Sequence, residues 1–357
     1  MKLLFAVVAL AFCVACSDDD APESIYGHYD VDVLYAPNGL GDGGYCDMIR
    51  SGVLRSVEQY AFNLKEHCPG TKEEGWEIFR QWYRDYGKGK DRGRKKLFVF
   101  ASNAYGEQLR NFAPPQMENR SLMLFEVAEG IDNVCTFRLG MYGAACYLGN
   151  LVAHKVSSAA LLAANPYDRN LKECVDGFRE GFLKPFVDKD VGGDMDKEPE
   201  IIGDKKKYID AGTLTVRYLS DEPDMGFAMP DSAFRLASGL YRDYGFVFPL
   251  AGGSNMGVLQ NMDKFPQAVY TAGVDVDMNH YSPKVLASLE KRMDLAVERN
   301  IFEWLNGRLM EGHTYYGLDT EFVEVTISEA YREAYAPTLP GLEEKAMEKE
   351  FDFLRRQ

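Results

Sequence analysis

Apolar and polar positions along this chain follow two periods in turn, which predicts alternating strands and helices. Short apolar runs rich in Val, Leu and Phe are typical of buried strands, and in the first half they lie at 29–36, 96–102, 121–128, 133–139 and 157–164. The segments between them carry apolar residues every three or four positions. This spacing predicts amphipathic helices at 46–68, 76–86, 143–156 and 171–186.

The second half continues the alternation. Strands are predicted at 212–220, 245–257, 267–277 and 321–328, and helices at 231–244, at 282–305 and in the charged C-terminal segment. Repeated strand–helix units with apolar strands indicate parallel sheets covered by helices on both faces, and therefore an α/β fold. The charged, glycine-rich segment 188–207 interrupts this pattern and is expected to form a surface excursion.

The N-terminal residues have the composition of an export signal. Lys2 precedes an apolar run too short to span a bilayer, so residues 1–15 are interpreted as a signal peptide. "CVAC" resembles a lipobox, which predicts cleavage before Cys16 and a lipid on its sulfur; an ordinary signal peptide cut nearby is the alternative. The acidic "SDDD" lies in a predicted tether at 16–25 and is either a surface-export tag or a solvated linker.

Composition narrows the possible partners. The 357 residues exceed one compact core, which rarely grows beyond about 250–300 residues, so two lobes are predicted. A net charge of −15 argues against nucleic acid, whose affinity for proteins comes largely from neutralised phosphates. The basic run at 88–96 is interpreted as a solvated loop, with contact to lipid headgroups as the lesser option. An odd number of cysteines after Cys16 predicts free thiols, and the scattered histidines predict no metal or cofactor.

The turns that follow the predicted strands are the candidate binding positions, because open α/β sheets bind ligands beyond the carboxyl ends of their strands. Four such turns lie at 42–45, 102–105, 252–257 and 275–277. In the first turn, glycines allow the backbone to approach a ligand, and Asp42 is either a ligand contact or a helix cap. Ser102 and Tyr105 are the candidates in the second turn. The carboxylates of "GVDVD" can accept hydroxyl hydrogen bonds from a sugar ring, or they cap helices or form ion pairs.

Motifs for covalent chemistry are missing from the sequence. It has no Gly-x-Ser-x-Gly elbow, and "GGSNMG" lacks the Lys-Ser/Thr of a phosphate-binding loop. The chain is therefore predicted not to be an enzyme. A nucleoside or glycoside hydrolase is the alternative, because Asp and Glu are plentiful.

Six short motifs occur in a fixed order: "GDGGYCDMIRSG", "YLGNLVA", "GFREG", "LAGGSNMG", "GVDVD" and "LASLEKR". Over roughly 29–305 they resemble the basic membrane protein family, lipoproteins that bind purine nucleosides for ABC importers. The resemblance implies a type I periplasmic-binding fold, two lobes that enclose ligand in a cleft. The expected division is 26–150 plus about 276–310 for lobe 1, 151–275 plus about 311–340 for lobe 2, and a C-terminal helix at 341–357.

The resemblance also implies roles for residues of the first turn and of the predicted helix at 171–186. Asp42 would bond the base or ribose, and Tyr45 would line the cleft as an aromatic. Phe178 occupies the Gly-Phe position of "GFREG", as a ligand contact or in helix–sheet packing. The family's Phe-Asn is Tyr45-Cys46 here, and a cysteine lacks the amide that can read a base edge.

The remaining implied contacts lie in the second half. Gly253 would approach the ligand through its backbone, and Asp275 or Asp277 with Lys291 would hold the ribose hydroxyls. The sequence thus predicts a lipid-anchored solute-binding protein of the cell envelope for a nucleoside or similar polar metabolite, partnered by an ABC permease or an outer-membrane protein. A sugar-binding protein of the same fold and a surface-exposed accessory capture lipoprotein are the alternatives.

Overall fold

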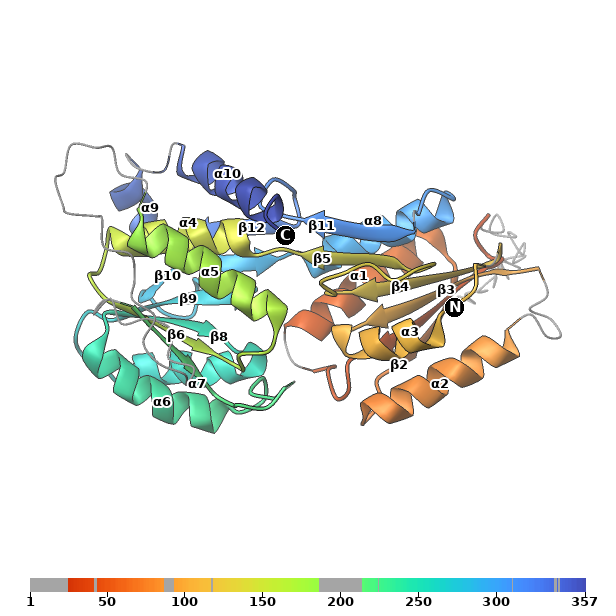
Figure 1. Ribbon diagram of the computed structural model, residues 1–357, viewed down its shortest axis with the longest axis horizontal. Helices are drawn as coiled ribbons and strands as arrows, with labels where there is room; N and C mark the ends of the chain where they lie inside the picture. Colours follow the sequence, from red (N-terminus) through yellow and green to blue (C-terminus); the bar gives the residue numbers. More distant parts are fainter. Residues whose placement is uncertain are drawn as a thin grey trace, which may run out of the picture.

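The computed structural model describes residues 25–41, 44–86, 93–116, 118–185, 214–223, 225–309, 311–336, 339 and 341–357. They form two lobes that lie side by side, each built on one six-stranded sheet (Figure 1). Helices cover both faces of each sheet, and apolar clusters fill the interfaces. The predicted α/β architecture with two mostly parallel sheets is therefore confirmed. Cys16, Asp42, the tether and the excursion at 188–207 lie outside the described residues.

The first sheet has the order β11-β5-β4-β3-β1-β2, and all its pairings are parallel. Its strands are β1 (Tyr29–Tyr35), β2 (Asn63–His67), β3 (Lys95–Ala101), β4 (Arg120–Phe125), β5 (Cys135–Leu139) and β11 (Gly312–Tyr316). The helices of this lobe are α1 (Tyr45–Tyr60), α2 (Lys72–Asp85), α3 (Gly106–Phe112) and α8 (Met293–Leu305). Helix α2 begins where the Thr71 hydroxyl accepts a hydrogen bond from the Glu74 amide, a standard N-cap.

The second sheet has the order β12-β10-β9-β8-β6-β7, parallel except for the β10–β12 pair. Its strands are β6 (Ala159–Ala163), β7 (Leu214–Tyr218), β8 (Phe246–Leu250), β9 (Tyr270–Asp275), β10 (Val285–Lys291) and β12 (Val323–Ile327). Its helices are α4 (Tyr142–Ala153), α5 (Arg169–Leu183), α6 (Pro230–Asp243), α7 (Asn255–Met262), α9 (Glu329–Tyr335) and α10 (Leu342–Leu354).

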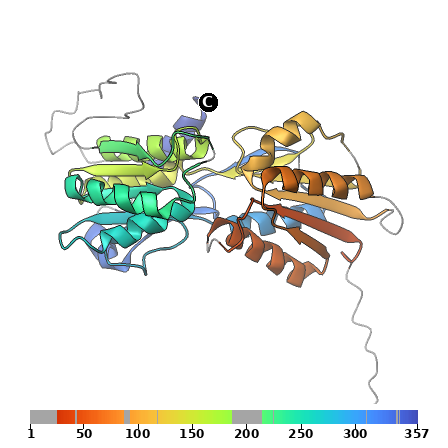
Figure 2. The ribbon, with the colours of Figure 1, turned by 90° about the horizontal axis from the view of Figure 1, so that it is seen from below.

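The chain passes between the lobes three times: after β5, after β10 and between β11 and β12 (Figure 2). These crossings correct the predicted lobe boundaries. Helix α4 and strand β10 belong to the second lobe, although 26–150 and 276–310 were predicted for the first. Strand β11 belongs to the first lobe, although 311–340 was predicted for the second.

Two of the predicted helices are wrong in part. The segment 282–305 is strand β10 followed by helix α8, because Val285–Lys291 pairs between β9 and β12. The helix predicted at 46–68 ends at Tyr60, and 63–67 forms β2 at the edge of the first sheet. In both places tertiary pairing overrides a local helical spacing.

Glycines hold α4 and α5 unusually close together. A Cβ atom at Gly181 of "GFREG" would lie 2.0 Å from the Cys146 carbonyl oxygen of α4, and one at Gly149 would lie 2.3 Å from the Phe178 carbonyl oxygen. The Phe178 ring is fully buried and lies against Phe246 and Phe248 of the second sheet. The glycine motifs at these positions therefore serve helix–helix packing.

Replacing Gly181 by Ala is expected to lower the free energy of unfolding by about 1–3 kcal/mol, because the added methyl forces two backbones apart. Gly239 of α6 is the matched control, since a Cβ atom there meets nothing within 4 Å. The Gly239→Ala variant should be as stable as the wild type or more stable, by up to about 1 kcal/mol. Denaturant unfolding measures both variants; equal stability of the two would refute the close-packing argument.

Candidate functional site

The carboxyl ends of the two sheets meet at a buried ion pair. Lys291 ends β10 in the second lobe, and its Nζ lies 2.7 Å from Oε2 of Glu126, the residue after β4 in the first lobe. Both residues are buried, at 9% and 6% exposure. The other Glu126 oxygen, Oε1, accepts a hydrogen bond from the Leu139 amide at 2.8 Å. One side chain thus fixes the ends of β4, β5 and β10 together.

One residue of this ion pair and one neighbour of it have strained backbones. Glu126 has φ +59° and Asp275, the last residue of β9, has φ +72°. Non-glycine residues rarely adopt this left-handed conformation, and such strain is often found at functional sites. Glu126 is held in it by its amide, which donates to the Phe137 carbonyl at 2.7 Å, and by its own carbonyl, which accepts from Asn170 Nδ2 at 3.2 Å.

Charge at this junction favours a permanently protonated lysine. Burial opposes the ammonium charge of Lys291, but the carboxylates of Glu126 and Asp275 outweigh that effect and raise the Lys291 pKa above its usual value. The junction therefore combines one fixed cation with two carboxylates. Such a set can donate hydrogen bonds to, and accept them from, neighbouring hydroxyl groups of a ligand.

The loop after β6 supplies a part of the junction that sequence reasoning missed. Asn165 Oδ1 accepts from the amides of Tyr167 and Asp168 at 3.0 Å, and its Nδ2 donates to the Met225 carbonyl at 2.8 Å. Asp168 caps α5 by accepting hydrogen bonds from the Asn170 and Leu171 amides. Burial raises the pKa of Asp168 despite these two bonds. Tyr167 is 52% exposed in the loop that follows β6. The signal available in the sequence was "NPYD" directly after a fully apolar strand.

Several of the predicted site residues lie at strand ends but apart from the ion pair. Ser102 follows β3 and is buried, and its hydroxyl accepts from the Ala104 amide at 3.2 Å. Gly253 is exposed in the short helix η3 (Gly252–Ser254) after β8. Tyr45 begins α1 and is half-buried against the core. Of the predicted residues, Asp275 and Lys291 are the two that the structure brings into one electrostatic cluster.

Three predicted residues have positions that point to structural roles. Tyr105 is fully buried, and its hydroxyl donates to the Tyr35 carbonyl at 3.0 Å beneath the first sheet's helices. Phe178 is fully buried between α5 and the second sheet, as described above. Asp277 is exposed and organises its own turn, where Oδ1 accepts from the Asn279 amide at 2.8 Å. The structure therefore corrects Tyr105 and Phe178 from candidate ligand contacts to core residues.

A second buried cluster ties the crossing segments together. Arg138 of β5 lies with Nη1 2.9 Å from Oε2 of Glu173 in α5, and both side chains are 3% exposed. The Tyr315 hydroxyl of β11 lies 3.0 Å from Glu173 Oε1 and 2.8 Å from Glu350 Oε1 of α10. The Met141 amide in the first crossing donates to Glu173 at 3.0 Å. We call these residues, Arg138, Glu173, Tyr315 and Glu350, the hinge cluster.

Helix α10 joins this cluster to two crossings. Glu350 Oε1 accepts from the Gly143 amide at 3.0 Å in the first crossing, and Oε2 accepts from the Leu318 amide at 2.8 Å in the third. Burial raises the pKa of Glu350 against the lowering effect of these bonds. The C-terminal helix is therefore a component of the connection between the lobes.

The cysteines of the described residues are mostly buried. The five cysteines after Cys16 are free thiols, four of them buried, and burial raises the pKa of Cys135 and of Cys146 to about 12. Within the described ranges, no group of three or more His, Cys, Asp or Glu side chains is placed to hold a metal ion. Among the helices of those ranges, none has both the length and the apolar character of a membrane span.

Comparison with solved structures defines the class of fold. The chain is similar to an ABC transporter solute-binding protein from Aeropyrum pernix K1, with a TM-score of 0.64 and 18% identity over 91% of this chain and 86% of that one. It is similar to GanP, a glucose-galactose binding protein from Geobacillus stearothermophilus, with a TM-score of 0.57 and 11% identity over 84% and 98%. No protein-family model and no curated protein matches the sequence.

The same fold also serves a different class of protein. A transcriptional activator of the comK gene from Bacillus halodurans matches with a TM-score of 0.60 and 15% identity, over 88% of this chain and 97% of that one. At these identities the comparisons establish the fold. The chain has the type I periplasmic-binding-like fold, which its sequence motifs predicted.

Proposed function

We propose that this chain is a solute-binding protein of an ABC importer and that it closes its lobes around a small, hydroxyl-bearing metabolite. The observation that carries the proposal is the buried Glu126–Lys291 pair beside Asp275, at the place where the carboxyl ends of both sheets meet. Ligands of open α/β sheets bind at such ends. The likeness to solute-binding and sugar-binding proteins supports the same role.

The proposed binding mode follows from the chemistry of the junction. Lys291 donates hydrogen bonds to ligand hydroxyls, and Asp275 accepts from them. Tyr45 and Tyr167 supply aromatic surface from opposite lobes, and Gly253 leaves room for close backbone approach. Because the ligand contacts both lobes, its binding shifts the equilibrium toward the closed form without any chemical step.

The proposed ligand is a nucleoside, because the six motifs resemble a nucleoside-binding family, and a free sugar is the alternative. Thermal unfolding of the purified protein with purine and pyrimidine nucleosides, bases and simple sugars tests the choice. A true ligand at 100 times its dissociation constant adds about 2.7 kcal/mol of stability, a clearly raised midpoint. A rise with nucleosides alone supports the first ligand class, and a rise with sugars alone supports the second. If no compound of the panel raises the midpoint, both proposed ligand classes are contradicted.

We also propose that the protein is anchored in the cell envelope through lipid on Cys16. The "CVAC" sequence supports this anchor, and "SDDD" supports display at the cell surface as an accessory capture protein. Cells fed radiolabelled palmitate should label the wild type, whereas a Cys16→Ala variant should stay unlabelled. Protease treatment of intact cells should then remove the protein; full protection would argue for the periplasmic face of the membrane.

A further inference from the structure

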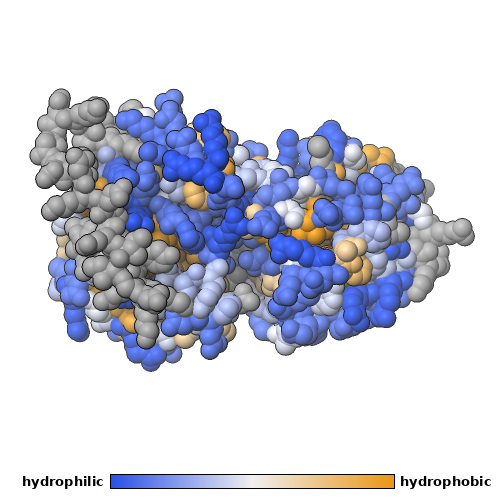
Figure 3. Space-filling view, in the orientation of Figure 1, coloured by the Kyte–Doolittle hydropathy of each residue, from blue (hydrophilic) through white to orange (hydrophobic). Residues whose placement is uncertain are grey.

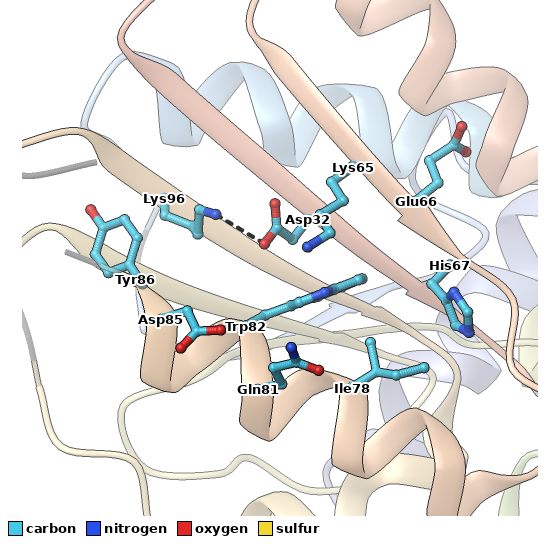
Figure 4. A pocket seen from close by; sticks show the side chains of 10 residues that line it. All are labelled: Asp32, Lys65, Glu66, His67, Ile78, Gln81, Trp82, Asp85, Tyr86 and Lys96. Atoms are coloured by element: carbon cyan, nitrogen blue, oxygen red, sulfur yellow. Dashed lines mark hydrogen bonds and ion pairs between the residues drawn. The ribbon is translucent and has the colours of Figure 1, made fainter. Parts of the chain in front are cut away.

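A cavity of about 330 Å³ lies in the first lobe between α2 and the β2 edge of the sheet. Figure 4 shows Asp32, Lys65 and Lys96 on the sheet side and Trp82 and Gln81 on the helix side, with the two sets facing each other across the space. The cavity runs alongside the middle of β1 and the start of β3. It is therefore separate from the interlobe junction at the carboxyl ends of the strands.

The floor of the cavity is a buried ion pair beside apolar residues of the same sheet face. Asp32 has a side-chain exposure of 4%, and its Oδ2 lies 3.0 Å from Lys96 Nζ, whose side chain is 11% exposed. Strand alternation puts Asp32 on the same sheet face as Leu34, which is packed with Phe98 in the apolar cluster under α2. Burial raises the pKa of Asp32 even though Lys96 lowers it.

A buried ion pair at such a position is costly without a use. Apolar residues of similar volume usually give equal or greater stability than a buried ion pair. Within the described part of the chain, the Asp32 side chain forms one hydrogen bond, from Lys96 Nζ to Oδ2. Its second oxygen, Oδ1, is therefore available to accept a hydrogen bond from a molecule in the cavity. Lys96 has further N–H groups to donate.

The walls add an aromatic face and a second ammonium group. Lys65 Nζ lies 4.6 Å above the centre of the Trp82 ring, and the Lys65 side chain is exposed, so its ammonium group can donate to a molecule beside the ring. Gln81 offers an amide at the rim. Three carboxylates and two ammonium groups line the space, so the net charge is close to zero and disfavours an anion.

From this arrangement we propose that the cavity under α2 is a second binding site, and that it takes a neutral sugar ring. Adjacent hydroxyls of one ring can donate to Asp32 and accept from Lys96, and the apolar face of the ring can lie against Trp82. The volume is at the small end of ligand pockets, which span about 300–1,000 Å³, and suits about one ring. The source is either a free monosaccharide or the terminal unit of a glycan.

Tryptophan labelled with ¹⁵N tests the site directly. The chain has three tryptophans, so each indole signal can be assigned by a Trp→Phe variant, and Trp304 of α8 is an internal reference. Glucose, galactose and ribose are titrated as free sugars, and methyl glycosides and maltose as glycan ends. The Trp82 signal should shift and saturate while Trp304 stays fixed. A response to free sugars alone identifies a free monosaccharide as the ligand. A response to the glycosides as well identifies the terminal unit of a glycan.

Three substitutions distinguish binding in this cavity from indirect effects of mutation. Asp32→Asn should raise the dissociation constant about tenfold or more, because it weakens a buried charged hydrogen bond. Asp30→Asn is the matched control: Asp30 has the same strand face and a similar pair with Arg94 at 2.7 Å, but it does not line the cavity. It should bind as the wild type. Lys65→Met, at an exposed position that folding tolerates, should weaken binding severalfold.

A Lys291→Met variant distinguishes the cavity from the interlobe junction. The Trp82 signal of this variant should still shift with sugar, although the variant has lost ligand binding between the lobes. No saturable Trp82 shift with any sugar of the panel would overturn the proposal. An unchanged dissociation constant in both Asp32→Asn and Lys65→Met would overturn it as well.

Discussion

Replacing Arg138 by Met is expected to lower the free energy of unfolding by about 3 kcal/mol, because it leaves the Glu173 carboxylate buried without its cation. The two side chains are 3% exposed, and 2.9 Å separates Nη1 from Oε2. Neither Nε nor Nη1 of Arg138 reaches good hydrogen-bond geometry within the described residues, although its guanidinium lies 4.9 Å from the centre of the Tyr315 ring. Attraction between the two charges therefore holds the pair. We expect a loss of stability at the lower end of the range of about 3–5 kcal/mol that is typical when one partner of a buried ion pair is removed.

Arg169 supplies a matched control for this prediction. It also forms an Arg–Glu pair between the lobes, with Glu129 at 3.0 Å, but the two side chains are 48% and 69% exposed. Water screens such a pair, so Arg169→Met should change stability by less than about 1 kcal/mol. Denaturant unfolding of both variants measures the difference. Equal losses would show that the hinge cluster contributes no more than a surface contact.

The second large effect is expected at the interlobe ion pair. Lys291→Met should cost about 3 kcal/mol of stability, because Glu126 is left as a buried carboxylate without its lysine. Glu126→Gln alone should also destabilise, but the double variant should lose less than the sum of the two. A coupling of about 2 kcal/mol is expected for residues in direct contact.

The same variants test the binding role of Lys291. In the ligand panel, Lys291→Met should abolish the rise in unfolding midpoint that the wild type shows. Lys284→Met is the matched control, because Lys284 lies just before β10 and its Nζ donates to the Met262 carbonyl at 3.3 Å. Lys284→Met should lose stability yet keep the full ligand response. Retained ligand response in Lys291→Met would remove that residue from the proposed binding site.

The hinge cluster gives the two lobes a defined connection. Its carboxylates bind backbone amides of the crossings at Met141, Gly143 and Leu318. A backbone held by buried acceptors cannot rotate freely at those amides, since each broken bond leaves a buried polar group. Motion of the lobes is therefore expected to be concentrated at the residues that flank these amides in the first and third crossings.

Local sequence patterns predicted the elements whose own apolar spacing matches their secondary structure. The strands at 29–36 and 96–102 and the helix at 171–186 appear as β1, β3 and α5. The strand end at 273–277 indicated Asp275, because open α/β sheets bind ligands beyond the carboxyl ends of their strands. Lys291 was indicated by the family resemblance of "LASLEKR", within a segment that was predicted to be helical. Glu126 gave no such signal, since it lay inside the strand predicted at 121–128, whereas β4 ends at Phe125.

The sequence by itself determined the α/β class, the parallel sheets and the apolar faces, because those follow from the period of hydrophobic residues along a single element. The tertiary structure alone decided which lobe each crossing element joins. It turned the helical spacing of 285–291 into β10, and it brought Glu126 to within 2.7 Å of Lys291. The physical reason is that strand pairing and burial of charge depend on partners outside any local window, as for Glu126 and Lys291, which are 165 positions apart.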